Sequence, residues 1–165
     1  MIRFGVVVVG VLVAGVAFAA DPGPADFAAM TAPVKKLVVA INTGAVALPA
    51  GVFTDDASVQ DDFGPYRWVG PGAAAAWYTG LVGGTPKDQA DFRAMKAVLT
   101  VSAPKFARIT GDTAYFVLPS VFVFNDSGKR IHQTGAWIMS ERREGKAWLI
   151  AGHAWAITGE TPSDK

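Results

Sequence analysis

The order of apolar and polar residues predicts helices in the first half of the chain and strands in the second. From Thr31, a plausible N-cap, apolar residues recur at the spacing of an amphipathic helix. The stripe comprises Val34, Leu37, Val38 and Ile41. Asn42-Thr43-Gly44 is typical of a helix end. We therefore expect one helix over this segment and a second, short helix over residues 45–52.

Turn-forming residues divide the next part of the chain into short elements. The expected order is a turn over residues 53–57, a short strand over 58–63, a loop over 64–68, a helix over 70–84 and one or two further helical turns over 85–92.

Four long apolar, β-branched and aromatic runs follow, separated by turn signals. They cover residues 97–109, 113–124, 130–142 and 147–158. This pattern predicts an antiparallel meander, with a bend or bulge at Pro104. Helices followed by strands predict an α+β fold, in which the helices gather on one face of a curved antiparallel sheet.

The run over residues 113–124 is apolar on both faces. Tyr115 and Val117 share one face, while Phe116 and Leu118 share the other. A strand with one face in water should alternate cleanly between apolar and polar residues. The second face must therefore be covered by a partner subunit or by the chain itself, and we expect a homodimer joined through the sheet.

The N-terminal residues have the pattern of a secretory signal peptide. Arg3 precedes a long apolar run, and Ala17 and Ala19 fit the small residues of a cleavage site. A membrane anchor is the alternative, but a spanning helix needs about 20 apolar residues, and residues 21–24 (DPGP) interrupt a helix. We expect cleavage after Ala19, export to the periplasm or beyond, and no membrane segment in the mature chain.

Cleavage would leave 146 residues, enough for one domain with a hydrophobic core. The expected organisation is a signal peptide over residues 1–19, a linker over 20–30, one α+β domain over 31–159 and a disordered tail over 160–165.

Charge and composition exclude several classes of function. The chain has 15 basic and 14 acidic residues, and loss of Arg3 balances them, which is unlike a nucleic-acid-binding protein. It has no cysteine, so it has no disulfide and no thiolate metal site. Its two histidines lie on different predicted strands without a carboxylate at ligand spacing. We therefore predict no metal and no cofactor.

Four stretches resemble the SnoaL-like branch of the nuclear transport factor 2-like superfamily. They are residues 53–57 (FTDDA), 61–68 (DDFGPYRW) with Gly70 and Ala73, 111–115 (GDTAY) and 144–150 (EGKAWLI). The resemblance implies a cone in which a curved sheet wraps around a long helix, with a pocket at its open end and frequent dimerisation through the sheet. It leaves the function open, because this fold hosts isomerases, dehydratases, cyclases, hydrolases and proteins without chemistry.

Asp61 is the first candidate for a catalytic residue. It shares strand parity with Val59 and Phe63, so its side chain is expected to point inward. Burial raises the pKa of a carboxyl towards working pH, as a general acid or base requires. The alternative is that Asp61 simply caps the following loop.

His153 is the second catalytic candidate. If the last strand contains no bulge, Leu149, Ala151, His153, Trp155 and Ile157 share one face. Such an apolar face should turn towards the helices, so His153 is expected to be buried or in a pocket wall. The alternative is a core histidine without chemistry.

Aromatic side chains are the candidate ligand-binding residues. Tyr66, Trp68 and Trp77 flank the loop where a hydrophobic ligand would enter the cone. Tyr115 and Trp155, from the strands, complete the predicted set.

Two classes of function remain. The first is a non-enzymatic domain that binds a small apolar molecule or a protein partner. The second is an isomerase, dehydratase or hydrolase acting on a hydrophobic small molecule, with Asp61 or His153 as acid or base. We favour the first, because the sequence contains no evident acid–base pair. If the side chains of Asp61 and His153 face one cavity, the enzyme class becomes better supported.

Overall fold

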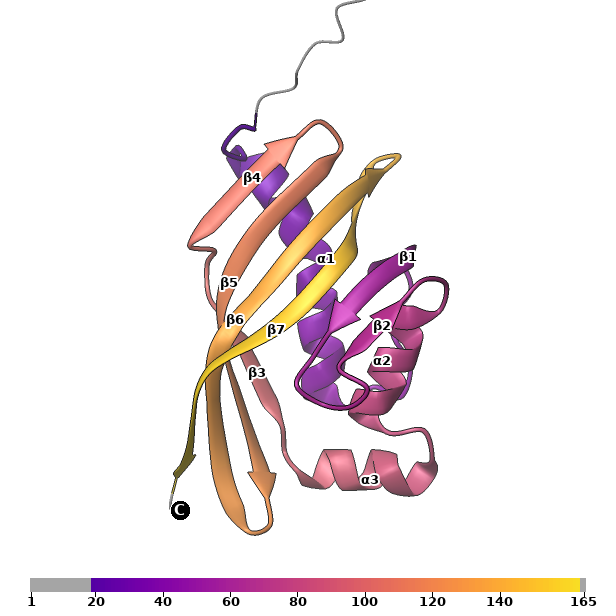
Figure 1. Ribbon diagram of the computed structural model, residues 1–165, viewed down its shortest axis with the longest axis vertical. Coiled ribbons are helices and arrows are strands. Elements are labelled where there is room, and N and C mark those ends of the chain that lie inside the picture. Colours follow the sequence, from indigo (N-terminus) through magenta and orange to yellow (C-terminus); the bar gives the residue numbers. More distant parts are fainter. Residues whose placement is uncertain (1–18, 164–165) are drawn as a thin grey trace, which may run out of the picture.

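The computed structural model describes residues 19–163, and its helices lie on one side of a strongly curved sheet (Figure 1). The predicted α+β class is confirmed. The helices are α1 (Pro24–Thr43), α2 (Ala73–Val82) and α3 (Pro86–Ala94). The strands are β1 (Phe53–Gln60), β2 (Arg67–Val69), β3 (Val98–Val101), β4 (Phe106–Thr110), β5 (Thr113–Asp126), β6 (Lys129–Glu144) and β7 (Ala147–Ser163).

The sheet has the strand order β2-β1-β7-β6-β5-β3, and β4 also pairs with β5. The long strands β5, β6 and β7 form the predicted antiparallel meander. The short strand β1 joins its edge in parallel to β7. This return of the chain extends the curved, open sheet around α1, so residues from both halves of the sequence meet inside the cone.

The helix α1 begins at Pro24, seven residues before the predicted start. Pro24 occupies the first turn, where its missing N–H does no harm, and Asp26 suits the positive end of the helix dipole. Thr31 is therefore not an N-cap; its hydroxyl donates to the carbonyl oxygen of Phe27 within the helix. The linker expected over residues 20–30 is wrong, since most of that segment is helical.

The predicted end of α1 is confirmed, but the short helix over residues 45–52 is not. Gly44 caps α1 in the left-handed conformation, at φ 61°. The following residues form turns that include Gly51, at φ 67°. Strand β1 then starts at Phe53, so the turn expected over residues 53–57 is also wrong.

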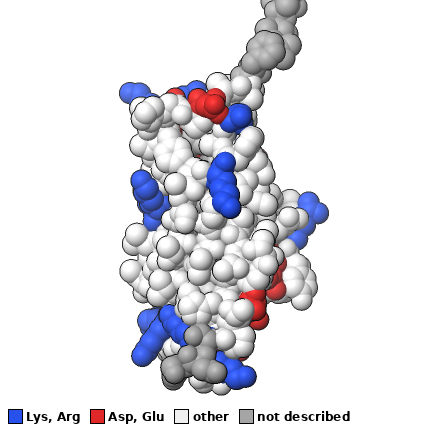
Figure 2. All heavy atoms as spheres, turned by 90° about the vertical axis from the view of Figure 1, so that its left-hand side faces the viewer, with Lys and Arg blue, Asp and Glu red and all other residues white. Residues whose placement is uncertain are grey.

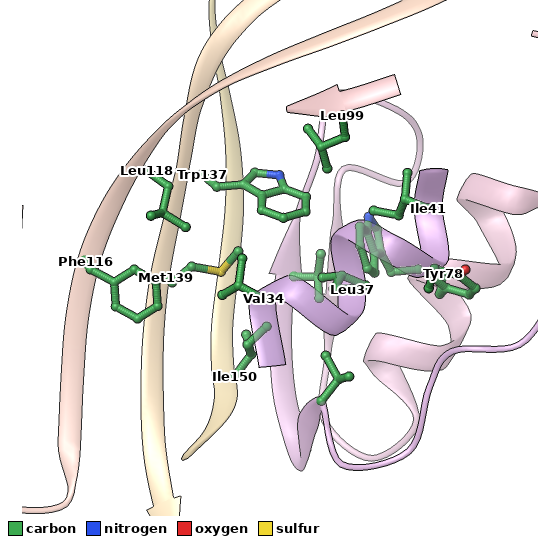
Figure 3. Close-up of a cluster of buried hydrophobic side chains, with 14 of the residues drawn as sticks. Val34, Leu37, Ile41, Tyr78, Leu99, Phe116, Leu118, Trp137, Met139 and Ile150 are labelled. Carbon is green, nitrogen blue, oxygen red and sulfur yellow. The ribbon is translucent and has the colours of Figure 1, made fainter. Parts of the chain in front are cut away.

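The core lies between α1 and the inner face of the sheet (Figure 3). Val34, Leu37 and Ile41, three of the four residues in the predicted stripe, are buried there. They face inward-pointing side chains of the sheet, which include Phe116, Leu118, Met139 and Ile150. The predicted bend at Pro104 is a complete interruption, because β3 and β4 pair with different parts of β5.

The last strand departs from the predicted alternation. The pairing of β6 with β7 shifts between Ser140 and Glu141, which places a bulge at Ala151. Ile150 and His153 consequently both point inward, whereas Leu149 and Ala151 do not share the face of His153. The strand also continues to Ser163, so the disordered tail expected from residue 160 is wrong over that part.

The outer face of the sheet is broad and carries few charges (Figure 2). Tyr115, Val117 and Val121 point outward from β5, since Phe116 and Leu118 point into the core. Across residues 19–163, no helix combines the length and the apolar character needed to cross a membrane. The predicted signal peptide lies outside the described residues, except for Ala19.

Candidate ligand-binding site

A small cavity lies between the ends of α1 and α2 and the inner face of the sheet. Its volume is about 50 Å³, room for about three water molecules. It is lined by Ile41, Asp61, Asp62, Trp77, Leu81, Leu99, Phe122, Gln133, Trp137 and Trp155. The lining is mostly apolar and aromatic, with a few polar groups, as is usual for a small-molecule site.

Three different elements bring the tryptophans together. Trp77 comes from the buried face of α2, while Trp137 of β6 and Trp155 of β7 are direct cross-strand partners on the inner face. Gly135 makes room for Trp155, because a Cβ atom at this glycine would lie 2.8 Å from the indole ring. A side chain at residue 135 would therefore displace one wall of the cavity.

Asp61 follows β1 and supplies a titratable group to the cavity. Its Oδ2 accepts a hydrogen bond of 2.6 Å from Nε1 of Trp77, and its Oδ1 accepts one of 2.8 Å from the backbone N–H of Asp62. Burial raises the pKa of Asp61 to about 7, and these two hydrogen bonds oppose that rise. Near neutral pH, the carboxyl of Asp61 is therefore present in both its neutral and its ionised form.

Gln133, another lining residue, is bonded to two further carboxylates. Nε2 of Gln133 donates to Oδ2 of Asp62 at 3.3 Å and to Oε2 of Glu160 at 2.7 Å. Gln133 is buried, so this amide holds two carboxylates from different parts of the chain beside the cavity.

His153 is buried behind the tryptophans and does not line this cavity. It lies opposite Met139 on β6, and its ring centroid is 5.0 Å from that of Trp77 and 5.0 Å from that of Trp137. Within residues 19–163, neither ring nitrogen has a hydrogen-bond partner. Burial lowers the pKa of His153 to about 3, so the ring is neutral near pH 7.

The two predicted catalytic residues thus contact the same indole without sharing the cavity. Asp61 is bonded to Trp77 from the cavity side, whereas His153 packs against the rings of Trp77 and Trp137. The burial predicted for His153 is confirmed, although the bulge at Ala151 overturns the alternation from which it was argued. The structure does not bring the two residues together as an acid–base pair.

The predicted ligand-binding residues divide into two groups. Trp77 and Trp155 line the cavity. Trp68 does not line it but packs on Phe63, with ring centroids 5.1 Å apart. Tyr66 is 65% exposed, and Tyr115 lies on the outer face of the sheet, so neither is placed at the cavity.

Trp137, Phe122 and Gln133 line the cavity but were not predicted as site residues. The alternation of β5 and β6 contains this signal, because Phe122 and Gln133 are direct partners on the inner face. Predicting these lining residues also requires the pairing register between β5 and β6, which the alternation within one strand does not give.

Glu141 is a second unexpected feature of the inner face. It is 1% exposed, and neither carboxyl oxygen has a hydrogen-bond partner in the described part of the chain. Burial raises the pKa of Glu141 to about 8. It lies two residues beyond Met139 on β6 and outside the cavity. The described residues contain no group of three or more potential metal ligands.

Three known structures with similar folds show the class of this domain. The hexachlorocyclohexane dehydrochlorinase LinA-type3 from Novosphingobium barchaimii is 13% identical, with a TM-score of 0.67 over 84% of this chain and 90% of that one. An NTF2-like protein with a cystatin-like fold from Novosphingobium aromaticivorans is 16% identical, with a TM-score of 0.61 over 81% and 82%. Rv3472(D26N), a Mycobacterium tuberculosis protein of unknown function, is 18% identical, with a TM-score of 0.61 over 82% and 76%.

These similarities show that the chain has the nuclear transport factor 2-like fold, as its sequence resemblance predicted. The SnoaL-like branch is consistent with them. No protein-family model matches the sequence, and no curated protein sequence matches it.

Proposed function

We propose that this domain binds a small, largely apolar molecule in the cavity beside Asp61. The observation that supports the proposal is the convergence of three tryptophans and one poised carboxyl on a single cavity. Aromatic walls supply contact area at little cost in conformational entropy, and one polar group fixes the orientation of a ligand.

The size of the cavity limits how a ligand would bind. Typical small-molecule pockets measure about 300–1,000 Å³, whereas this cavity measures about 50 Å³. Only the head group of a ligand fits the space as it stands. The rest of the ligand would lie at the edge of the cavity, or Leu81, Leu99 and Phe122 would move apart to admit it.

A general acid–base reaction at Asp61 is the second candidate function. A carboxyl with a pKa of about 7 suits proton transfer near neutral pH. The dehydrochlorinase among the similar structures shares the fold. His153 is a poor candidate for the base, since its pKa is about 3 and its ring does not line the cavity. Binding without turnover remains our first choice, because among the ten lining residues only Asp61 and its chain neighbour Asp62 are titratable, and His153 lies outside the cavity.

Mass spectrometry of molecules that co-purify with the mature chain tests the proposal. Trp155→Leu removes a cavity wall, whereas Tyr66→Leu removes an exposed aromatic ring outside the cavity and serves as the control. We expect the wild type and Tyr66→Leu to retain the same bound molecule and Trp155→Leu to lose most of it. Equal retention by both variants would contradict binding in this cavity.

We propose further that the protein is exported after cleavage behind Ala19. The residues just after this position belong to the folded domain: Ala20 pairs with Ile109 of β4, and Asp21 forms an ion pair with Arg108. Cleavage there would leave both contacts intact. N-terminal sequencing of periplasmic protein should begin at Ala20-Asp21; recovery only in the membrane fraction with Met1 retained would contradict this.

A further inference from the structure

The polar side chains of the cavity are rich in acceptors. Asp61 and Asp62 contribute carboxyl groups, and the N–H groups of Trp77 and Gln133 already donate to carboxylates. Each carboxylate has about four lone-pair sites, so acceptor capacity is left over. None of the ten lining residues is Lys, Arg or His.

The apolar part of the lining is mainly aromatic. Four of the ten lining residues carry aromatic rings, namely Trp77, Phe122, Trp137 and Trp155. Aromatic rings attract a cation placed over their faces, and tryptophan does so best. Acceptors and aromatic rings together therefore favour a ligand that brings both a positive charge and N–H donors.

We propose that the ligand carries a protonated amine, bound beside Asp61 among the tryptophans. This inference rests on the proposed function and names the chemical class of its ligand. An ammonium group is also small enough for a cavity of about 50 Å³, which leaves the apolar body of the ligand at the edge.

The charges around Asp61 agree with this assignment. Asp62 lies next to it in the chain, and Gln133 joins Asp62 to Glu160 of β7. His153, on the far side of Trp77, is neutral near pH 7. An incoming cation would therefore meet carboxyl groups and, among the ten lining residues, no positive charge, and it would favour the ionised form of Asp61.

The ionisation of Asp61 gives this ligand class a distinctive pH dependence. The pKa of Asp61 is about 7, so its carboxyl becomes anionic as the pH rises through that value. An amine should bind more tightly on the alkaline side, while the amine itself is still protonated. A carbonyl ligand, whose oxygen accepts a hydrogen bond from the neutral carboxyl, should show the opposite trend.

Three probes with the same benzyl body separate these cases: benzylamine, benzyl alcohol and benzaldehyde. Their affinities for the mature chain can be measured by calorimetry about one pH unit below and about one above the pKa of Asp61. We expect benzylamine to bind most tightly, with an affinity that rises by up to about tenfold between the two conditions. Asp61→Asn should remove both effects, and Asp55→Asn, an exposed change outside the cavity, should retain them.

The possible failures are distinguishable. Tighter binding of benzaldehyde or benzyl alcohol, lost in Trp155→Leu, would overturn the amine assignment and leave the proposed binding function intact. Binding of benzylamine that is unchanged in Asp61→Asn would also overturn the assignment. Absence of binding by all three probes would overturn the amine assignment and count against the cavity as a binding site.

Discussion

The indole of Trp77 and the carboxyl of Asp61 are joined by a hydrogen bond of 2.6 Å, from Nε1 to Oδ2. This bond ties α2 to the end of β1 and fixes the carboxyl at the cavity. It also stabilises the charged form of Asp61, whereas burial favours the neutral form. Together with the neighbouring Asp62, whose carboxyl raises the pKa and whose backbone N–H lowers it, these effects place the pKa of Asp61 at about 7.

Replacing Trp77 with Phe should raise the pKa of Asp61 further. The substitution keeps an aromatic ring in the core and removes only the N–H donor among the polar groups. A hydrogen bond to a charged group contributes about 1.5–3 kcal/mol, so the midpoint of the titration should move up by about one pH unit or more. Carboxyl NMR of Asp61 measures this midpoint directly.

Trp137→Phe is the matched control for that experiment. Trp137 also lines the cavity and packs against His153, but it makes no hydrogen bond to Asp61. The titration of Asp61 should change little in this variant. Equal changes in both variants would show that loss of packing, rather than loss of the donor, moves the pKa.

His153 should act as a neutral aromatic ring of the core. Neither nitrogen has a partner among the described residues, so His153→Phe leaves no hydrogen bond broken and should not lower stability at neutral pH. His153→Ala should cost about 3–5 kcal/mol, because it leaves a cavity between two tryptophans. Urea unfolding of both variants at neutral pH compares the two effects.

The same residue should make the domain sensitive to acid. Its pKa is lowered from 6.5 to about 3 in the folded state, so the unfolded chain takes up the proton first. The stability that depends on the neutral ring is complete above about pH 6.5 and is lost as the pH falls towards 3. His153→Phe should remove this loss, whereas His132→Phe should leave it unchanged. If the free energy of unfolding depends on pH in the same way in the wild type and in His153→Phe, the burial of the ring is contradicted.

Features that depend on spacing within one segment could be predicted from the sequence, whereas features that depend on contacts between distant segments could not. Local periodicity predicted the buried stripe of α1 and the long strands, because both arise from spacing within one segment. The start of α1 was missed, since prolines and glycines around residues 21–24 suggested a linker, although the residues that follow include good helix formers such as Ala28 and Ala29.

Strand register limited the prediction of the cavity itself. Trp137 and Trp155 are neighbours only because β6 and β7 pair in one register, and the bulge at Ala151 decides which face His153 occupies. Neither feature has a local signal in the sequence. Glu141 was missed for another reason: a carboxyl is almost never buried without a partner, so alternation alone does not predict it.

Ionisation of Glu141 should destabilise the domain as the pH rises from about 4.5 to about 8. Its pKa is raised from 4.5 to about 8 in the folded state, so the folded chain holds the proton more tightly. The contribution of Glu141 to stability is therefore greatest below about pH 4.5 and falls as the pH rises towards 8, by up to about 1.4 kcal/mol per pH unit. Glu141→Gln should remove this decline, and Glu144→Gln, an exposed change on the same strand, should not. Urea unfolding measures the free energy of unfolding of both variants across this pH range. Identical slopes of this free energy against pH in the two variants would contradict the prediction.

The outer face of the sheet provides the last prediction, a homodimer. Val98, Phe106 and Tyr115 are between 43% and 46% exposed, and Val117 and Val121 lie beside them on the outward side of β5. Burying such apolar area stabilises association by about 25 cal/mol per Å² removed from water, before the costs of association are subtracted. Val121→Lys places a charge in the centre of this face, whereas Val39→Lys places one on the exposed side of α1. Light scattering at micromolar concentration should show a dimer for the wild type and Val39→Lys and a monomer for Val121→Lys; a monomeric wild type would refute the interface.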